Sequence, residues 1–103
     1  MPARDPLSDS ALEDALRDLE DWALEADDDG TRIVRDFALG DFRTAWAFLT
    51  RVAFEAEDLD HHPEIANVYD QVSLSLSTHD AGNRVTETDL ELARRIDALA
   101  PAA

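Results

Sequence analysis

The chain has 103 residues, 45% of them apolar, and carries a formal charge of −15. This length suits one small domain, and we expect a single domain over residues 1–103 with residues 1–9 as a flexible tail. Cysteine is absent, which excludes a disulfide framework, a thiolate zinc site and a cysteine nucleophile.

The charge balance argues against two classes of partner. With 24 acidic residues against 9 basic ones, the surface repels phosphate backbones and anionic lipids, so we expect no nucleic-acid partner and no membrane partner. The longest unbroken apolar run, Ala45 to Leu49, is far shorter than the roughly 20 residues of a membrane span. No apolar segment typical of a secretory signal is visible at the start, so a cytoplasmic location is expected.

The acidity has two explanations that the sequence leaves open. All nine basic residues are arginines, and aspartate outnumbers glutamate by sixteen to eight. A surface adapted to high salt would have this composition, because screening removes its self-repulsion. An acidic surface combined with an arginine-favouring base composition would look the same.

The first third of the chain predicts a helix followed by a hairpin. Leucines recur at helical spacing over residues 10–22, and Ser10 with Glu13 is typical of a capping box. A short strand over residues 22–25, a turn ending at Gly30 and a strand over residues 31–39 follow. Glycine can adopt the positive φ of a turn, and after it Ile33, Arg35 and Phe37 alternate with Val34, Asp36 and Ala38 as the two faces of a strand.

The remaining chain predicts a long helix, two more strands and a last helix. Residues 42–58 place one apolar face at helical spacing, made of Phe42, Ala45, Trp46, Leu49, Val52, Ala53 and Ala56. Residues 65–69 predict a short strand or turn, and residues 71–78 predict a strand with serines on one face. Thr86 and Asp89 are typical of a capping box for a helix that Pro101 closes. This order predicts an α+β fold, a four-stranded antiparallel sheet packed on one face by three helices.

The three histidines are the residues best suited to proton transfer. His61 and His62 lie at the break after the long helix, and His79 lies at the end of the clearest strand. A helix end and a strand end can meet at one rim of such a sheet, where imidazoles titrate near neutral pH. Glu57 precedes His61 by one helical turn and Asp60 is adjacent, so either carboxylate could orient an imidazole.

Other interpretations of these residues are weaker but stay open. The histidines could simply satisfy backbone groups at a helix end and a strand end. A zinc site of His61, His79 and a carboxylate is disfavoured, because adjacent histidines rarely face one metal and no His-x3-His pair occurs. No serine lies on a Gly-x-Ser-x-Gly turn, and no glycine-rich phosphate loop is present.

The spacing of these polar residues resembles the signature of the pterin-4a-carbinolamine dehydratases. The matching positions are Glu57-x3-His61-His62-Pro63, Tyr69, His79 and Asp89. The segments 35–42, 52–57, 63–69, 78–82 and 86–93 are also similar, so the resemblance covers roughly residues 12–99. Two positions depart from the family pattern. The loop over residues 82–85 is one residue longer than the usual Gly-Gly-Leu form, and Leu39 replaces a common second aromatic.

The resemblance implies a dehydratase that converts a 4a-hydroxytetrahydropterin to quinonoid dihydropterin and water, without a metal or an organic cofactor. The residues it implies for catalysis are His61, His79 and His62. By this analogy His61 and His79 are the acid and base, and His62 mainly holds the pterin ring. The implied substrate-binding set is His62, Glu57, Asp60, Pro63 and Thr78. The resemblance also implies a homodimer or homotetramer.

Two questions stay open at this point. Asp89 could be functional, or it could only cap its helix. The same pocket residues would also suit a non-catalytic pterin-binding protein or a molybdopterin-related protein. Some animal relatives assist dimerisation of a homeodomain transcription factor, but nothing in this sequence gives a reason to expect that role.

Overall fold

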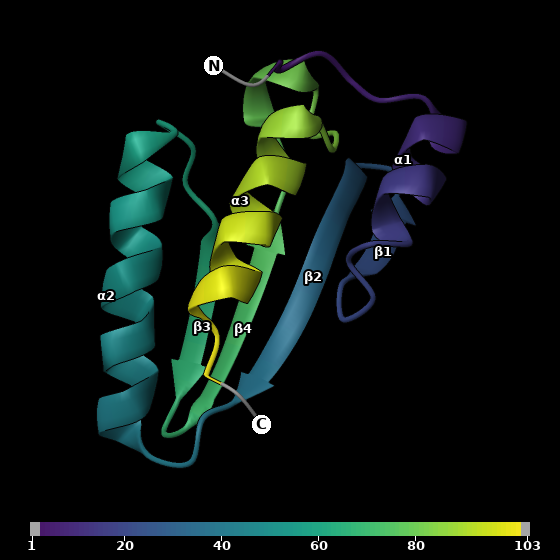
Figure 1. Ribbon diagram of the computed structural model, residues 1–103. Helices are drawn as coiled ribbons and strands as arrows, with labels where there is room; N and C mark the ends of the chain where they lie inside the picture. Colours follow the sequence, from purple (N-terminus) through teal and green to yellow (C-terminus); the bar gives the residue numbers. More distant parts are fainter. Residues whose placement is uncertain (1–2, 102–103) are drawn as a thin grey trace.

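The computed structural model describes residues 3–101 as four antiparallel strands in one sheet and three α-helices, which confirms the predicted α+β fold. The strands lie in the order β1-β2-β4-β3 (Figure 1). In chain order, the elements are α1 (Asp9–Leu16), β1 (Ala23–Asp27), β2 (Gly30–Ala38), α2 (Phe42–Asp58), β3 (Glu64–Val68), β4 (Gln71–Leu76), the 3₁₀ turn η1 (His79–Ala81) and α3 (Glu87–Leu99).

The core lies between the sheet and the helices. Alternation along the two central strands turns one set of side chains toward the helices, and its large apolar members are buried: Ile33, Phe37, Val72, Leu74 and Leu76. The serines of β4 lie on the opposite face, as predicted. Figure 1 shows α3 in front of β4, with α2 on one side of it and β2 on the other, and α1 next to β1. None of the helices within residues 3–101 is long and apolar enough to cross a membrane.

The long helix α2 has the predicted extent, but its buried face differs from the prediction. Asp41 caps its start by accepting a hydrogen bond from the Thr44 amide at 2.7 Å, which lowers the pKa of the Asp41 carboxyl. Phe48 is buried and packs on Phe37, with ring centroids 4.9 Å apart. The rings predicted to be buried, Phe42 and Trp46, are about half exposed. Both flank the stripe of Ala45, Leu49, Val52 and Ala56, but on the side that the sheet and α3 do not cover.

The first helix is shorter than predicted. It ends at Leu16 rather than near residue 22, and its N-cap is Ser8, which accepts from the Ala11 amide at 3.1 Å, instead of Ser10. The segment after it continues in turns whose amides bond to the carbonyl three residues earlier, so the helical spacing persists without an α-helix. This segment buries Leu19 and Trp22.

The strand that leads to His79 ends earlier than predicted. Regular pairing stops at Leu76, and Thr78 forms an isolated bridge with Arg84. Between them η1 and the following loop turn the chain back toward α3. Residues 64–68 form a strand rather than a turn, and Thr86 with Asp89 forms the predicted capping box of α3. The end of α2 and the end of β4 therefore lie at the same rim of the sheet (Figure 1).

Candidate active site

All three histidines line one hollow at this rim. His61 and His62 follow α2, and His79 begins η1. The hollow has a volume of about 290 Å³ and is called the rim hollow here; its lining is Arg4, Asp60, His61, His62, Ser77, Thr78, His79 and Asp80. The meeting of a helix end and a strand end has thus brought together imidazoles that are up to 18 positions apart in the chain.

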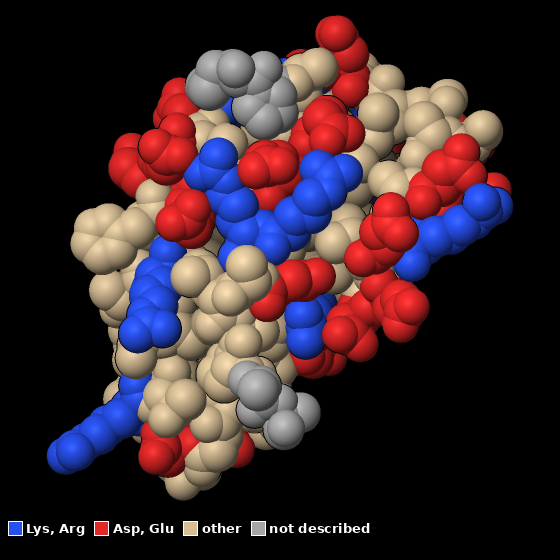
Figure 2. Space-filling view, viewed as in Figure 1, with Lys and Arg blue, Asp and Glu red and all other residues tan. Residues whose placement is uncertain are grey.

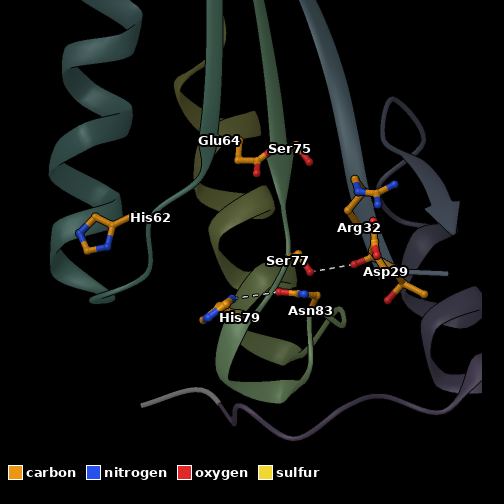
Figure 3. A pocket seen from close by; sticks show the side chains of 9 residues that line it. Asp29, Arg32, His62, Glu64, Ser75, Ser77, His79 and Asn83 are labelled. Carbon is orange, nitrogen blue, oxygen red and sulfur yellow. Dashed lines mark hydrogen bonds between the residues drawn. The ribbon is translucent and has the colours of Figure 1, made fainter. Parts of the chain in front are cut away.

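A second hollow lies next to it over the end of the open sheet face. This sheet-face hollow has a volume of about 330 Å³ (Figure 3), and its lining is Asp29, Thr31, Arg32, His62, Glu64, Ser75, Ser77, His79 and Asn83. His62, Ser77 and His79 line both hollows. A ligand could therefore contact these three residues from either side.

His61 is buried and is held by a buried carboxylate. Its Nε2 contacts Oδ1 of Asp89, whose side chain has no exposed surface. The other oxygen, Oδ2, accepts hydrogen bonds from the Thr78 hydroxyl and the Thr86 amide, both at 2.8 Å. A carboxylate can only accept, so the Nε2–H of His61 donates to Asp89 and Nδ1 carries the lone pair.

Arg4 contacts the other nitrogen of His61. Its Nη1 lies 3.4 Å from Nδ1 of His61, while Nη2 donates to the carbonyls of Leu59 and Asp60 at 2.8 and 2.9 Å. These carbonyls lie at the end of α2, where a cation is favourable. The carbonyl of Ala3 accepts from the amide and hydroxyl of Thr88, which holds this segment against α3. Both ring nitrogens of His61 thus contact protein groups.

His62 lies on the surface beside two carboxylates. Its Nε2 is 3.6 Å from Oε2 of Glu57, and a ligand atom from each of Glu57, Asp60 and His62 lies within 4.8 Å of the others. This spacing would admit a cation. All three side chains are exposed, however, and exposed acidic groups commonly lie this close without one.

His79 is exposed and contacts one polar partner on its own turn. Its Nδ1 lies 3.0 Å from Oδ1 of Asn83. The ring edge that carries Nε2 points away from Asn83 in Figure 3. This nitrogen is therefore the one available to a ligand in the hollows that His79 lines.

Arg32, a positive charge in the sheet-face hollow, is paired with carboxylates. Arg32, which lines the sheet-face hollow, donates to Asp27 at 2.7 Å and lies 3.6 Å from Glu25. The hydrogen bond to Asp27 raises the pKa of Arg32 and lowers that of Asp27. Arg32 therefore remains a cation at any working pH, with its charge partly balanced by these carboxylates.

The predicted binding residues occupy different places. Asp60 and Thr78 line the rim hollow, but the Thr78 hydroxyl is directed at Asp89. Glu57 and Pro63 line neither hollow. Sequence reasoning missed several lining residues, namely Arg4, Asp29, Thr31, Arg32, Glu64, Ser75, Ser77, Asp80 and Asn83. Strand alternation was a signal for the two serines, since residues 73, 75 and 77 share one face and lead to position 79.

Comparison with known proteins gives the same family along nearly the whole chain. The model of the family described as pterin 4 alpha carbinolamine dehydratase matches residues 5–99. A Bradyrhizobium protein is 52% identical over 96 residues, 93% of each chain, and one from Opitutus terrae is 47% identical over 91 residues, 88% of this chain and 90% of the other. Both are provisionally named pterin-4-alpha-carbinolamine dehydratases.

Two solved structures are also similar. A transcriptional coactivator/pterin dehydratase from Brucella melitensis superimposes with a TM-score of 0.86 at 40% identity, over 94% of this chain and all of the other. A pterin dehydratase-like protein described as a RuBisCO assembly factor of the alpha-carboxysome gives 0.65 at 25% identity, over 80% and 92% of the chains. On the family match and these identities, the chain belongs to the pterin 4 alpha carbinolamine dehydratase family.

Proposed function

We propose that this protein dehydrates a 4a-hydroxytetrahydropterin to the quinonoid dihydropterin, using His61 and His79 for proton transfer. The observation that carries this proposal is the rim hollow, where three histidines converge and one of them is held by a buried carboxylate. Imidazoles titrate close to neutral pH, so a pair of them can supply an acid and a base at one site.

The reaction requires two proton transfers and no change of oxidation state. An acid protonates the 4a-hydroxyl, the C4a–O bond breaks with release of water, and a base accepts a ring proton. His79 suits the base, because its Nδ1 is engaged by Asn83 and its Nε2 has no hydrogen bond to any described residue. His61 suits the acid, acting through Nδ1, because its Nε2–H is already bound to Asp89.

This assignment places a requirement on Arg4. A guanidinium has only donors, so Arg4 can contact Nδ1 of His61 only while that nitrogen carries a lone pair. When His61 acts as the acid, Nδ1 carries the proton and Arg4 turns aside. The hydroxyl of the substrate then occupies the place of the guanidinium beside Nδ1.

The remaining residues are proposed to bind and orient. His62 lines both hollows and is exposed, which suits contact with the pterin ring. Glu57 and Asp60 lie beside it and would hold its imidazole. Thr78 would act through Asp89, and Pro63 would fix the chain direction between His62 and β3.

A coupled assay tests the proposal. The 4a-hydroxytetrahydropterin is generated in place and its loss is followed by absorbance, for the wild type and for His61→Ala and His79→Ala. We expect the wild type to accelerate dehydration and each variant to lose most of that acceleration while retaining the wild-type circular dichroism spectrum. A wild type that leaves the spontaneous rate unchanged would rule out the dehydratase function.

The alternative is a pterin-binding protein without dehydratase activity, including one that acts on a molybdopterin-related ligand. One observation supports this alternative. The chain is similar to a dehydratase-like protein described as a RuBisCO assembly factor, which is named for a role other than catalysis. Retained binding of a pterin, measured by calorimetry, together with absent turnover would favour this alternative.

We also propose that the chain forms a homodimer or homotetramer. Large apolar side chains are exposed on three elements: Leu24 on β1, Phe42, Trp46 and Phe54 on α2, and Ile65, Val68 and Tyr69 in and after β3. Contiguous exposed apolar surface and an unpaired edge strand both favour association. Light scattering coupled to size exclusion should give the mass of a dimer or tetramer, and a monomer at working concentration would contradict this.

A further inference from the structure

We propose that Asn83 is a positioning residue that sets the tautomer of His79. Its side-chain oxygen lies 3.0 Å from Nδ1 of His79, so the imidazole donates its Nδ1–H to the amide and keeps its lone pair on Nε2. This inference deepens the proposed function, since it states how His79 is prepared to act as the base.

The backbone of Asn83 is held on both sides, so its side chain is presented from a defined place. Its φ of 59° is left-handed, a conformation that asparagine tolerates better than most residues. Its carbonyl accepts from the Thr31 amide of β2 at 2.9 Å, and its amide contacts the His79 carbonyl at 3.4 Å. The turn is closed by paired backbone bonds between Thr78 and Arg84, at 2.9 and 3.3 Å.

The tip of the β1–β2 hairpin adds a further constraint. Gly30 has a φ of 142°, and a Cβ placed on it would lie 2.0 Å from the Asn83 carbonyl oxygen. Only glycine permits this approach, so the loop that carries Asn83 rests directly on the hairpin backbone. The contact links the β1–β2 hairpin to the orientation of His79, which follows β4 in the chain.

His79 is also surrounded by charged groups from several elements. In the sheet-face hollow these are Asp29, Arg32, His62 and Glu64, and in the rim hollow they are Arg4, Asp60, His61, His62 and Asp80. Among the described residues, Asn83 alone forms a hydrogen bond with the His79 ring. The tautomer of His79 is therefore assigned to this contact and not to the surrounding charges.

Two substitutions separate the effect of the Asn83 side-chain oxygen from the effect of its left-handed backbone conformation. Asn83→Gly removes the oxygen and retains access to a left-handed φ, while Asn83→Asp retains an oxygen acceptor at the same place. Asn67→Gly is the matched control, because Asn67 also bridges a turn through its side chain but lies beside the β3–β4 turn, at the other end of β4 from His79. Imidazole ¹⁵N shifts report the tautomer of His79 in the full chain, and kcat and KM report its use.

In the wild type and in Asn83→Asp we expect the Nδ1–H form of His79. In Asn83→Gly we expect the Nε2–H form to gain population and kcat to fall about fivefold at unchanged KM, the loss expected for one hydrogen bond. Asn83→Asp should shift the acid limb of the kcat/KM profile to higher pH, because a carboxylate favours the protonated imidazole. Asn67→Gly should leave the tautomer and the profile unchanged.

An Nε2–H tautomer in the wild type, or a tautomer unaffected by Asn83→Gly, would overturn the inference. The outcome is separable from the proposed function. If the shifts behave as expected while the wild type fails to dehydrate the substrate, Asn83 orients His79 and the dehydratase function is wrong.

Discussion

Asp89 accepts the Nε2–H of His61 with one carboxylate oxygen and caps the start of α3 with the other. Asp89 therefore caps α3, as the capping box predicts, and also contacts a candidate catalytic histidine. The Thr78 hydroxyl donates to the capping oxygen as well, so a single buried carboxylate joins the end of α2, the end of β4 and the start of α3. The place of His61 depends on this junction.

Asp89→Asn should lower both stability and activity. An amide presents one acceptor oxygen, so it cannot accept from His61 and from the Thr78 and Thr86 donors together. A buried donor left unpaired costs about 1–3 kcal/mol, which thermal unfolding would measure. Turnover should fall at least about tenfold because His61 loses its orientation.

The half-buried Asp70 offers the control for this change. Within residues 3–101, its carboxylate accepts a hydrogen bond from the side chain of Gln71 alone. Asp70→Asn should therefore leave melting temperature and turnover close to those of the wild type. An Asp89→Asn variant with wild-type turnover would show that His61 does not need the carboxylate.

Features that depend on a local sequence pattern could be predicted from the sequence. Features that depend on contacts between distant segments of the chain could not. The alternation in β4 and the Thr86–Asp89 spacing predict the strand face and the capping box. Helical spacing of leucines predicts the burial of Leu12 and Leu19 but cannot tell an α-helix from successive tight turns. Helical spacing in α2 likewise does not show which side of its apolar stripe packs against the sheet and which side is exposed.

The two contacts that complete the candidate site had no sequence signal. Arg4 reaches His61 across 57 positions, and its segment resembles an ordinary charged terminus. Asn83 lies in the loop that departs from the family pattern, where the extra length is visible but its contact with His79 is not. Both depend on how the segments meet in space.

Gly30→Ala should destabilise the protein and impair the His79 turn. The new Cβ would lie 2.0 Å from the Asn83 carbonyl oxygen, so the hairpin or the loop must shift. We expect a loss of more than about 1 kcal/mol in thermal unfolding, together with a lower kcat.

Gly40→Ala is the control that separates the steric clash expected in Gly30→Ala from the backbone strain expected of any alanine at a positive φ. Gly40 also has a positive φ, but a Cβ there meets nothing within 4 Å. This variant should lose some stability and keep the wild-type kcat. Equal kinetic losses in both glycine variants would argue against a specific link between Gly30 and His79.

Arg4→Ala should make His61 chemically accessible. Arg4 contacts Nδ1 of His61 and lines the hollow in front of it, so its removal exposes that nitrogen. Faster acylation of His61 by diethyl pyrocarbonate, located by mass spectrometry, is the expected result. Arg17→Ala, which removes only an exposed pair with Asp14, should leave the rate unchanged. Unchanged labelling in Arg4→Ala would mean that Arg4 does not shield the ring.

Salt should stabilise this protein if its surface is adapted to high salt. Figure 2 shows basic side chains interleaved with acidic ones, and Arg95 pairs with Glu55, Asp58 and Glu91. Screening weakens such pairs, but a net charge of −15 leaves repulsion as the larger effect. The melting temperature should rise between about 0.1 and 1 M KCl, as the screening length falls from about 10 to 3 Å. A flat dependence would favour the base-composition explanation.

The most direct test of the central claim is the initial rate of dehydration for the wild type and for His79→Ala, without and with added imidazole. We predict that His79→Ala loses about a hundredfold or more of the acceleration. Free imidazole should restore part of it, because His79 is exposed and its place is open to solvent. A His79→Ala variant that dehydrates the substrate at the wild-type rate would contradict the proposed role of this histidine.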